Sequence, residues 1–182
     1  MAMVMYAQWR AWKTRPIISF LLEALTHLCQ LRGGFRVGVP NPSPFRSGQW
    51  SFPGGRRESE DPDLLHTALR ELEEECGIRL GREHFETALP PTQVGRRAGR
   101  SLRVAPFLFR VHGELPLVLD PREAVEGLWL PLKILRDPTR HAFQSVPGQP
   151  KETQFPAIEL NGVPLWGFTY RLIADWLGLG FS

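Results

Sequence analysis

The chain has 182 residues, of which 42% are hydrophobic and 23% are charged, and its formal net charge is +3. This length and composition fit one globular domain spanning residues 1–182 and argue against a disordered chain. The charge excess is too small to indicate a nucleic acid partner, and no apolar run approaches the roughly 18–20 residues of a membrane span.

The two cysteines, Cys29 and Cys76, have neither the number nor the spacing of a disulfide framework or a zinc site. The apolar start Met1–Met5 is followed by Arg10 and Lys13, which is the wrong charge order for a secretory signal. We therefore expect reduced thiols in a cytoplasmic protein without a membrane partner.

The segment Pro16–Arg32 fits two patterns. Its leucines recur at helical spacing, but Leu25–Leu31 also reads as a strand that could pair with Phe35–Pro40 across the turn Gly33-Gly34. We predict a short helix or extended segment first, and then this hairpin.

Residues 1–24 are predicted to form an N-terminal extension. They include Trp9 and Trp12, two large apolar side chains that need burial. We predict that these tryptophans contribute to a homodimer contact.

The clearest helical pattern lies between Asp61 and Gly77. Asp61 can cap a helix, Pro62 suits its first position, and Gly77 supplies a left-handed stop. On a helical wheel, Leu72 and Cys76 fall on the apolar arc that would face the core.

The rest of the chain interleaves strands and helices. We predict strands at Phe85–Leu89, Leu102–Val111 and Gly127–Leu132, with a basic loop at Thr92–Arg100. Ile158–Leu160 and Val163–Trp166 are predicted to form a hairpin around Asn161-Gly162. A final helix is predicted at Phe168–Leu177. Because no regular βαβ rhythm is present, the expected class is α/β in the α+β sense, with helices packed on a mixed sheet.

The predicted helix ends in an unusual concentration of acidic side chains. Glu71 and Glu75 are four residues apart and share a face, with Glu74 at its border. Like charges at this spacing cost about 0.2–0.5 kcal/mol per pair, and acidic groups in a last turn oppose the helix dipole by roughly 0.3–1 kcal/mol each. A divalent cation among the carboxylates would remove these costs. The alternative is a solvated acidic face on a surface helix.

A glycine pair precedes this helix. Gly55, an acidic loop and the run Arg70-Glu71-Leu72-x-Glu74-Glu75-x-Gly77-Ile78 together resemble the box of the Nudix hydrolases, here about residues 55–78. The resemblance implies an α/β/α sandwich with a mixed sheet. It also implies hydrolysis of a pyrophosphate bond in a nucleoside diphosphate derivative, with Mg²⁺ or Mn²⁺ as cofactor.

The segment between Gly55 and Arg70 is one residue longer than the usual box. The residue six positions after Gly55 is Asp61, which lies nine before Arg70, and this spacing weakens the expectation of a pair between Asp61 and Arg70. The longer box resembles that of the coenzyme A pyrophosphatase branch, although the region Val37–Pro42 departs from the branch's own marker. The alternatives are a Nudix hydrolase for ADP-ribose, nucleoside diphosphate sugars or oxidised nucleoside triphosphates, and a non-catalytic nucleotide sensor.

The resemblance also implies roles for individual residues. The expected metal ligands are Glu71, Glu74, Glu75 and the Gly54 carbonyl. Arg70 would orient the glutamates by ion pairing.

Further candidates lie outside the box. The general base could be a box glutamate, Glu123 or Glu126. Substrate phosphates could meet Arg96, Arg97 and Arg100, unless these belong to a solvated basic loop. Trp50 and Phe52 could contact a base or a pantetheine arm, and the alternative for this aromatic pair is the core.

Overall fold

The computed structural model describes residues 2–4, 17–25, 50–94, 102–112, 115–120 and 127–180. The predicted Gly33-Gly34 hairpin, the tryptophans Trp9 and Trp12 and the segment Val37–Pro42 lie outside these residues, so those predictions stay open.

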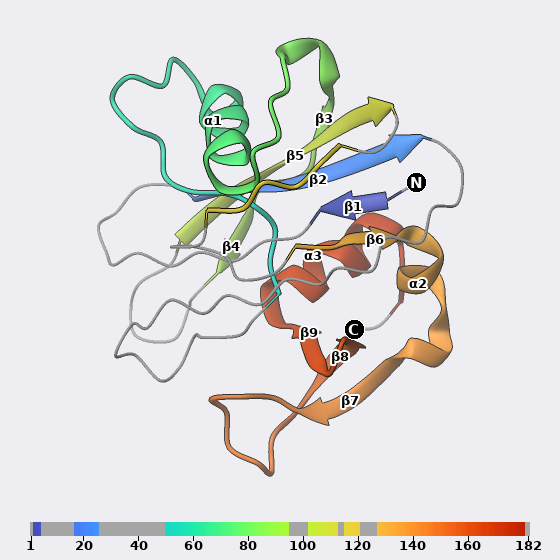
Figure 1. Cartoon of the computed structure of the whole chain (residues 1–182). Coiled ribbons are helices and arrows are strands. Elements are labelled where there is room, and N and C mark those ends of the chain that lie inside the picture. Colours follow the sequence, from blue (N-terminus) through green and yellow to red (C-terminus); the bar gives the residue numbers. More distant parts are fainter. Residues whose placement is uncertain are drawn as a thin grey trace.

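A mixed sheet is centred on the long strand β5 (Leu102–His112). Strand β2 (Ile17–Leu25) pairs with β5 in parallel along its full length, whereas β3 (Phe85–Ala88) and β4 (Thr92–Val94) pair with β5 antiparallel. In Figure 1 the β2–β5 pair runs between helix α1 (Leu64–Cys76) and helix α3 (Gly167–Leu177). The predicted α+β class with a mixed sheet is therefore confirmed.

Two smaller sheets complete the described architecture. Strand β1 (Ala2–Val4) pairs antiparallel with β6 (Trp129–Pro131). Strands β7 (His141–Ser145), β8 (Gln154–Leu160) and β9 (Val163–Trp166) form an antiparallel sheet in chain order, against which α3 packs.

Several predicted elements are confirmed. The strands expected near residues 85–89 and 102–111 correspond to β3 and β5, and the expected final helix corresponds to α3. Asn161 and Gly162 both adopt positive φ, 50° and 78°, as the turn of the β8–β9 hairpin requires.

Other predictions are narrowed or need correction. Of the two alternatives for the start of Pro16–Arg32, a short helix or an extended segment, the structure has the extended one at residues 17–25, because a continuous apolar run suits a parallel strand that pairs along its length. Thr92–Val94, expected in a loop, pairs with β5 as β4. The expected strand Gly127–Leu132 is reduced to β6, since Leu132 begins the short helix α2 (Leu132–Arg136).

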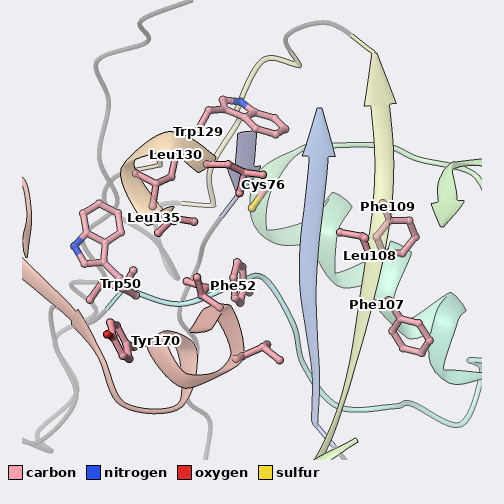
Figure 2. Close-up of a cluster of buried hydrophobic side chains, with 14 of the residues drawn as sticks. Trp50, Phe52, Cys76, Phe107, Leu108, Phe109, Trp129, Leu130, Leu135 and Tyr170 are labelled. Atoms are coloured by element: carbon pink, nitrogen blue, oxygen red, sulfur yellow. The ribbon is translucent and has the colours of Figure 1, made fainter. Parts of the chain in front are cut away.

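The core gathers apolar side chains from α1, β5, α2, β8 and α3. Figure 2 shows Trp50 and Phe52 among them, with Cys76, Leu135 and Tyr170. Trp50 is buried, and its indole Nε1–H donates to the Val163 carbonyl at 3.2 Å. Trp50 and Phe52, expected as substrate contacts, thus lie where the alternative interpretation places them, in the core.

Helix α1 begins later than expected. Asp63, not Asp61, is its N-cap, and the Asp63 carboxylate accepts from the His66 N–H at 2.8 Å. Gly77 ends the helix as predicted, with φ 67° and its N–H bonded to the Glu73 carbonyl. Among the described residues, the helices are all too short or too polar to cross a bilayer.

Candidate active site

Helix α1 buries two of its acidic side chains. Glu71 is 7% exposed and Glu75 is 1% exposed, whereas the Glu74 side chain is 58% exposed. A carboxylate is buried at a large cost unless charged or polar groups face it. The alternative of a solvated acidic face is therefore wrong for Glu71 and Glu75.

Glu75 meets the glycine pair that precedes the helix. The Gly54 N–H donates to Glu75 Oε2 at 3.0 Å, joining residues 21 apart in the chain. The amide of Gly54 thus fixes one oxygen of this carboxylate. The expected role of the Gly54 carbonyl as a metal ligand stays a prediction.

Glu71 packs against the second glycine. A Cβ atom added to Gly55 would overlap the carboxylate of Glu71, from its Cδ to both oxygens. Glycine is required here because of this close approach of a side chain to the backbone. Gly54 and Gly55 together therefore form a floor under the two buried carboxylates.

Arg70 contacts two glutamates of its own helix and the backbone of the loop that follows the glycine pair. Its Nη2 lies 3.0 Å from Glu71 Oε1 and donates to the Arg56 carbonyl at 3.1 Å, while its Nη1 lies 3.0 Å from Glu74 Oε2. Burial lowers the pKa of Arg70, but the bond to Asp61 and the charges of both glutamates outweigh it and raise that pKa. The guanidinium stays charged and pairs with Glu71 and Glu74, and its expected role of orienting them for a metal ion stays a prediction.

Asp61 is a partner of Arg70, although the longer box had weakened the expectation of this pair. Arg70 Nε donates to Asp61 Oδ1 at 3.2 Å, and Nη2 to Asp61 Oδ2 at 3.1 Å. Asp61 is 1% exposed and also accepts from the Glu58 N–H at 2.9 Å. The longer loop does not prevent this pair, and Arg57 holds the loop's end by donating to the carbonyls of Asp61 and Pro62.

The environment of Asp61 stabilises its charged form. Burial raises its pKa, but the hydrogen bonds from Arg70 and the Glu58 amide outweigh burial and hold the pKa at about 2. The signal that could have found this residue was its distance from the glycine, six positions after Gly55, and not its distance from Arg70.

The sequence comparisons point to one family. The NUDIX domain matches residues 36–148 of the chain, more than half its length. The chain belongs to the Nudix family. The contacts of Arg70 with Glu71 and Glu74 are therefore contacts within a Nudix box.

Curated Nudix relatives are similar over part of their length. The chain is 39% identical over 114 residues to the mitochondrial coenzyme A diphosphatase NUDT8 of Homo sapiens, covering 59% of this chain and 47% of that protein. It is 48% identical over 51 residues to the same protein of Mus musculus, covering 28% of this chain and 24% of that protein. The chain thus spans less than half the length of these relatives.

A solved Nudix structure supports the fold alone. The NUDIX domain of Shewanella oneidensis NrtR, complexed with ADP ribose, is 22% identical with a TM-score of 0.50, covering 67% of this chain and 76% of that chain.

The donor set of this Nudix box suits a hard divalent cation. Glu71 and Glu75 provide carboxylate oxygens beside the glycine floor, and Glu74 lies on the adjoining helix face. No three Asp, Glu, His or Cys side chains converge on one point within the described ranges. This is compatible with Mg²⁺, which is commonly held by one or two carboxylates together with waters and substrate phosphates.

The remaining site candidates are outside the described residues. These are the expected phosphate-binding arginines Arg96, Arg97 and Arg100 and the expected bases Glu123 and Glu126. Their roles stay predictions.

Proposed function

We propose that this Nudix protein is a metal-dependent pyrophosphohydrolase whose substrate is coenzyme A or a related nucleotide derivative. The observation that carries the proposal is the pair Glu71 and Glu75, buried one turn apart beside Gly54-Gly55, with Arg70 on Glu71 and the Gly54 N–H on Glu75. Burying two anions one turn apart is costly unless positive charge or donors face them, and a divalent cation would add such a charge beside Arg70 and the Gly54 amide.

Each residue of the box has a defined task in this proposal. Glu71 and Glu75 would hold the cation, with Glu74 or the Gly54 carbonyl completing the protein ligands. When bound, Mg²⁺ or Mn²⁺ polarises phosphoryl oxygens and lowers the pKa of a bound water. Arg70 orients Glu71 and Glu74 by ion pairing. The Gly54 amide holds one oxygen of the Glu75 carboxylate.

The substrate is proposed from the relatives. Both curated relatives described above are named coenzyme A diphosphatases, and the longer box of this chain resembles that branch. The segment Val37–Pro42 departs from the branch's marker, which favours a second candidate: a Nudix hydrolase for ADP-ribose, a nucleoside diphosphate sugar or an oxidised nucleoside triphosphate. The arginines Arg96, Arg97 and Arg100 are proposed to bind substrate phosphates in either case.

A panel of substrates tests the proposal. The protein is incubated with coenzyme A, ADP-ribose, a nucleoside diphosphate sugar and an oxidised nucleoside triphosphate, each with Mg²⁺ or Mn²⁺, and the products are resolved by mass. Phosphopantetheine with adenosine 3′,5′-bisphosphate is expected from coenzyme A. Faster cleavage of another substrate would select the second candidate. Binding without turnover of all four would indicate a sensor.

We further propose that the protein is a cytoplasmic homodimer in which Trp9 and Trp12 contribute to the contact. Light scattering of the purified chain tests the dimer, and a monomer would contradict it.

A further inference from the structure

The C-terminal turn of α1 carries Glu73, Glu74 and Glu75 but no basic residue. The carbonyl end of a helix dipole is negative, so three carboxylates there oppose it. The last carbonyls of a helix also lack partners within the helix. This turn therefore needs donors from elsewhere in the fold.

Residues 115–120, which we call the strap, supply these donors. The Val118 N–H donates to the Cys76 carbonyl at 2.9 Å, and the Asp120 N–H donates to the Glu75 carbonyl at 3.2 Å. Two amides thus lie at the negative end of the dipole, and that of Asp120 bonds to the backbone of Glu75 itself. Figure 1 shows this segment passing beneath α1.

The strap is anchored in the body of the protein. Its residues Leu115, Leu117 and Leu119 pack against the hydrophobic core, and the Trp129 indole Nε1–H donates to the Leu115 carbonyl at 3.1 Å. The strap is therefore held by the core on one side and bonds to the end of α1 on the other.

Val118 faces outward and rests on the residue that ends the helix. Its side chain is 66% exposed, and a Cβ atom on Gly77 would lie 2.6 Å from the Val118 Cβ. Gly77 is thus needed twice, for its left-handed φ of 67° and for the close approach of the strap.

We propose that the strap is a positioning element for Glu75. It holds the last turn of α1 in its helical register, so that the Glu75 carboxylate reaches Gly54 and the cation. This inference rests on the proposed function, because it assigns the strap a role only if Glu75 binds a metal ion.

The test removes one amide and keeps the side-chain change minimal. Val118→Pro deletes the N–H that caps the Cys76 carbonyl, whereas the matched control Val118→Ala keeps it. Two quantities are measured at a temperature where both variants are folded: hydrogen exchange of the amides in the last turn of α1, and the Mn²⁺ dissociation constant by calorimetry. We expect Val118→Pro to lose protection in that turn and to bind Mn²⁺ about tenfold more weakly. Val118→Ala should match the wild type in both.

A strap that serves only stability would lower the melting temperature without changing Mn²⁺ affinity in the folded protein, and this result would overturn the inference. If Val118→Pro does not fold, Gly77→Asn carries the same test. Asparagine tolerates positive φ, so this variant mainly crowds Val118.

Glu75→Gln separates the two proposals. If it binds Mn²⁺ as the wild type does, the metal role of Glu75 fails, and the strap's role fails with it. If Glu75→Gln binds weakly but Val118→Pro binds normally, only the strap's role fails.

Discussion

The guanidinium of Arg70 donates two hydrogen bonds to the carboxylate of Asp61, nine residues before it, from Nε at 3.2 Å and from Nη2 at 3.1 Å. The same guanidinium contacts Glu71 and Glu74. The Asp61–Arg70 pair therefore holds the guanidinium that contacts Glu71 and Glu74 on α1.

Replacing Asp61 by Asn should destabilise the protein markedly. The change leaves Arg70 short of a buried counter-charge, and removing one partner of a buried pair typically costs about 3 kcal/mol. Urea unfolding would measure the loss. Asp63→Asn is the matched control: it removes the same charge two residues away, where asparagine can still cap the helix and only the exposed pair with Arg82 is lost, so it should cost at most about 1 kcal/mol. Equal losses in the two variants would contradict the support role of Asp61.

The contribution of Asp61 should depend on pH in an acidic window. Its folded pKa of about 2 lies below its ordinary value of 3.8, so the charged form is favoured in the folded protein. The stabilisation is present above the ordinary value and is lost as the pH falls toward the folded one. Unfolding free energies of wild type and Asp61→Asn should therefore differ by a constant amount at neutral pH and converge between pH 3.8 and about 2. A difference that disappears already near neutrality would contradict this assignment.

Gly55→Ala should displace Glu71. The added methyl would occupy the position of the Glu71 carboxylate, which is buried and ion-paired with Arg70. We expect Mn²⁺ affinity to fall by about 10- to 100-fold, as for other changes that misplace a ligand. Gly81→Ala is the control, because its methyl also meets a glutamate carboxylate, that of Glu83, but on the surface, where the side chain can move into water. Calorimetric titration of both variants with Mn²⁺ decides the matter.

Glu75→Gln should reduce turnover by several orders of magnitude while leaving the fold intact. Glutamine keeps the shape and can still accept from the Gly54 N–H, but it removes the negative charge proposed to hold the cation. Turnover is measured on the best substrate of the panel, with circular dichroism as a check of folding. Glu73→Gln is the control: Glu73 lies on the same helix but pairs with Arg79 at the surface, so its turnover should stay at the wild-type level.

Removal of divalent cations should abolish turnover reversibly. Treatment with a chelator, followed by addition of Mg²⁺ or Mn²⁺, should restore the original rate, because a chelator removes the ion and leaves the carboxylate ligands Glu71 and Glu75 chemically unchanged. Full activity in the presence of excess chelator would contradict the proposed cofactor.

Much of the site could be predicted because its residues are close in the chain. Glu71, Glu74 and Glu75 share a helix face as a consequence of helical periodicity, and Gly77 ends that helix because it tolerates positive φ. The β8–β9 hairpin was equally local, since Asn161-Gly162 determines the turn. The strand at residues 17–25 could not be told from a short helix by sequence, because its stability comes from pairing with β5 about 87 positions later.

The sequence by itself determined the Nudix box, the acidic helix and the glycine pair, because each depends on spacing within a few turns of chain. Only the tertiary structure decided which carboxylates are buried, that Asp61 reaches Arg70 across a lengthened loop, and that Trp50 and Phe52 belong to the core. It also brought Val118 to Gly77. These relationships depend on how the loop and the strap fold back onto α1, and no periodicity in the sequence encodes the distance between segments so far apart.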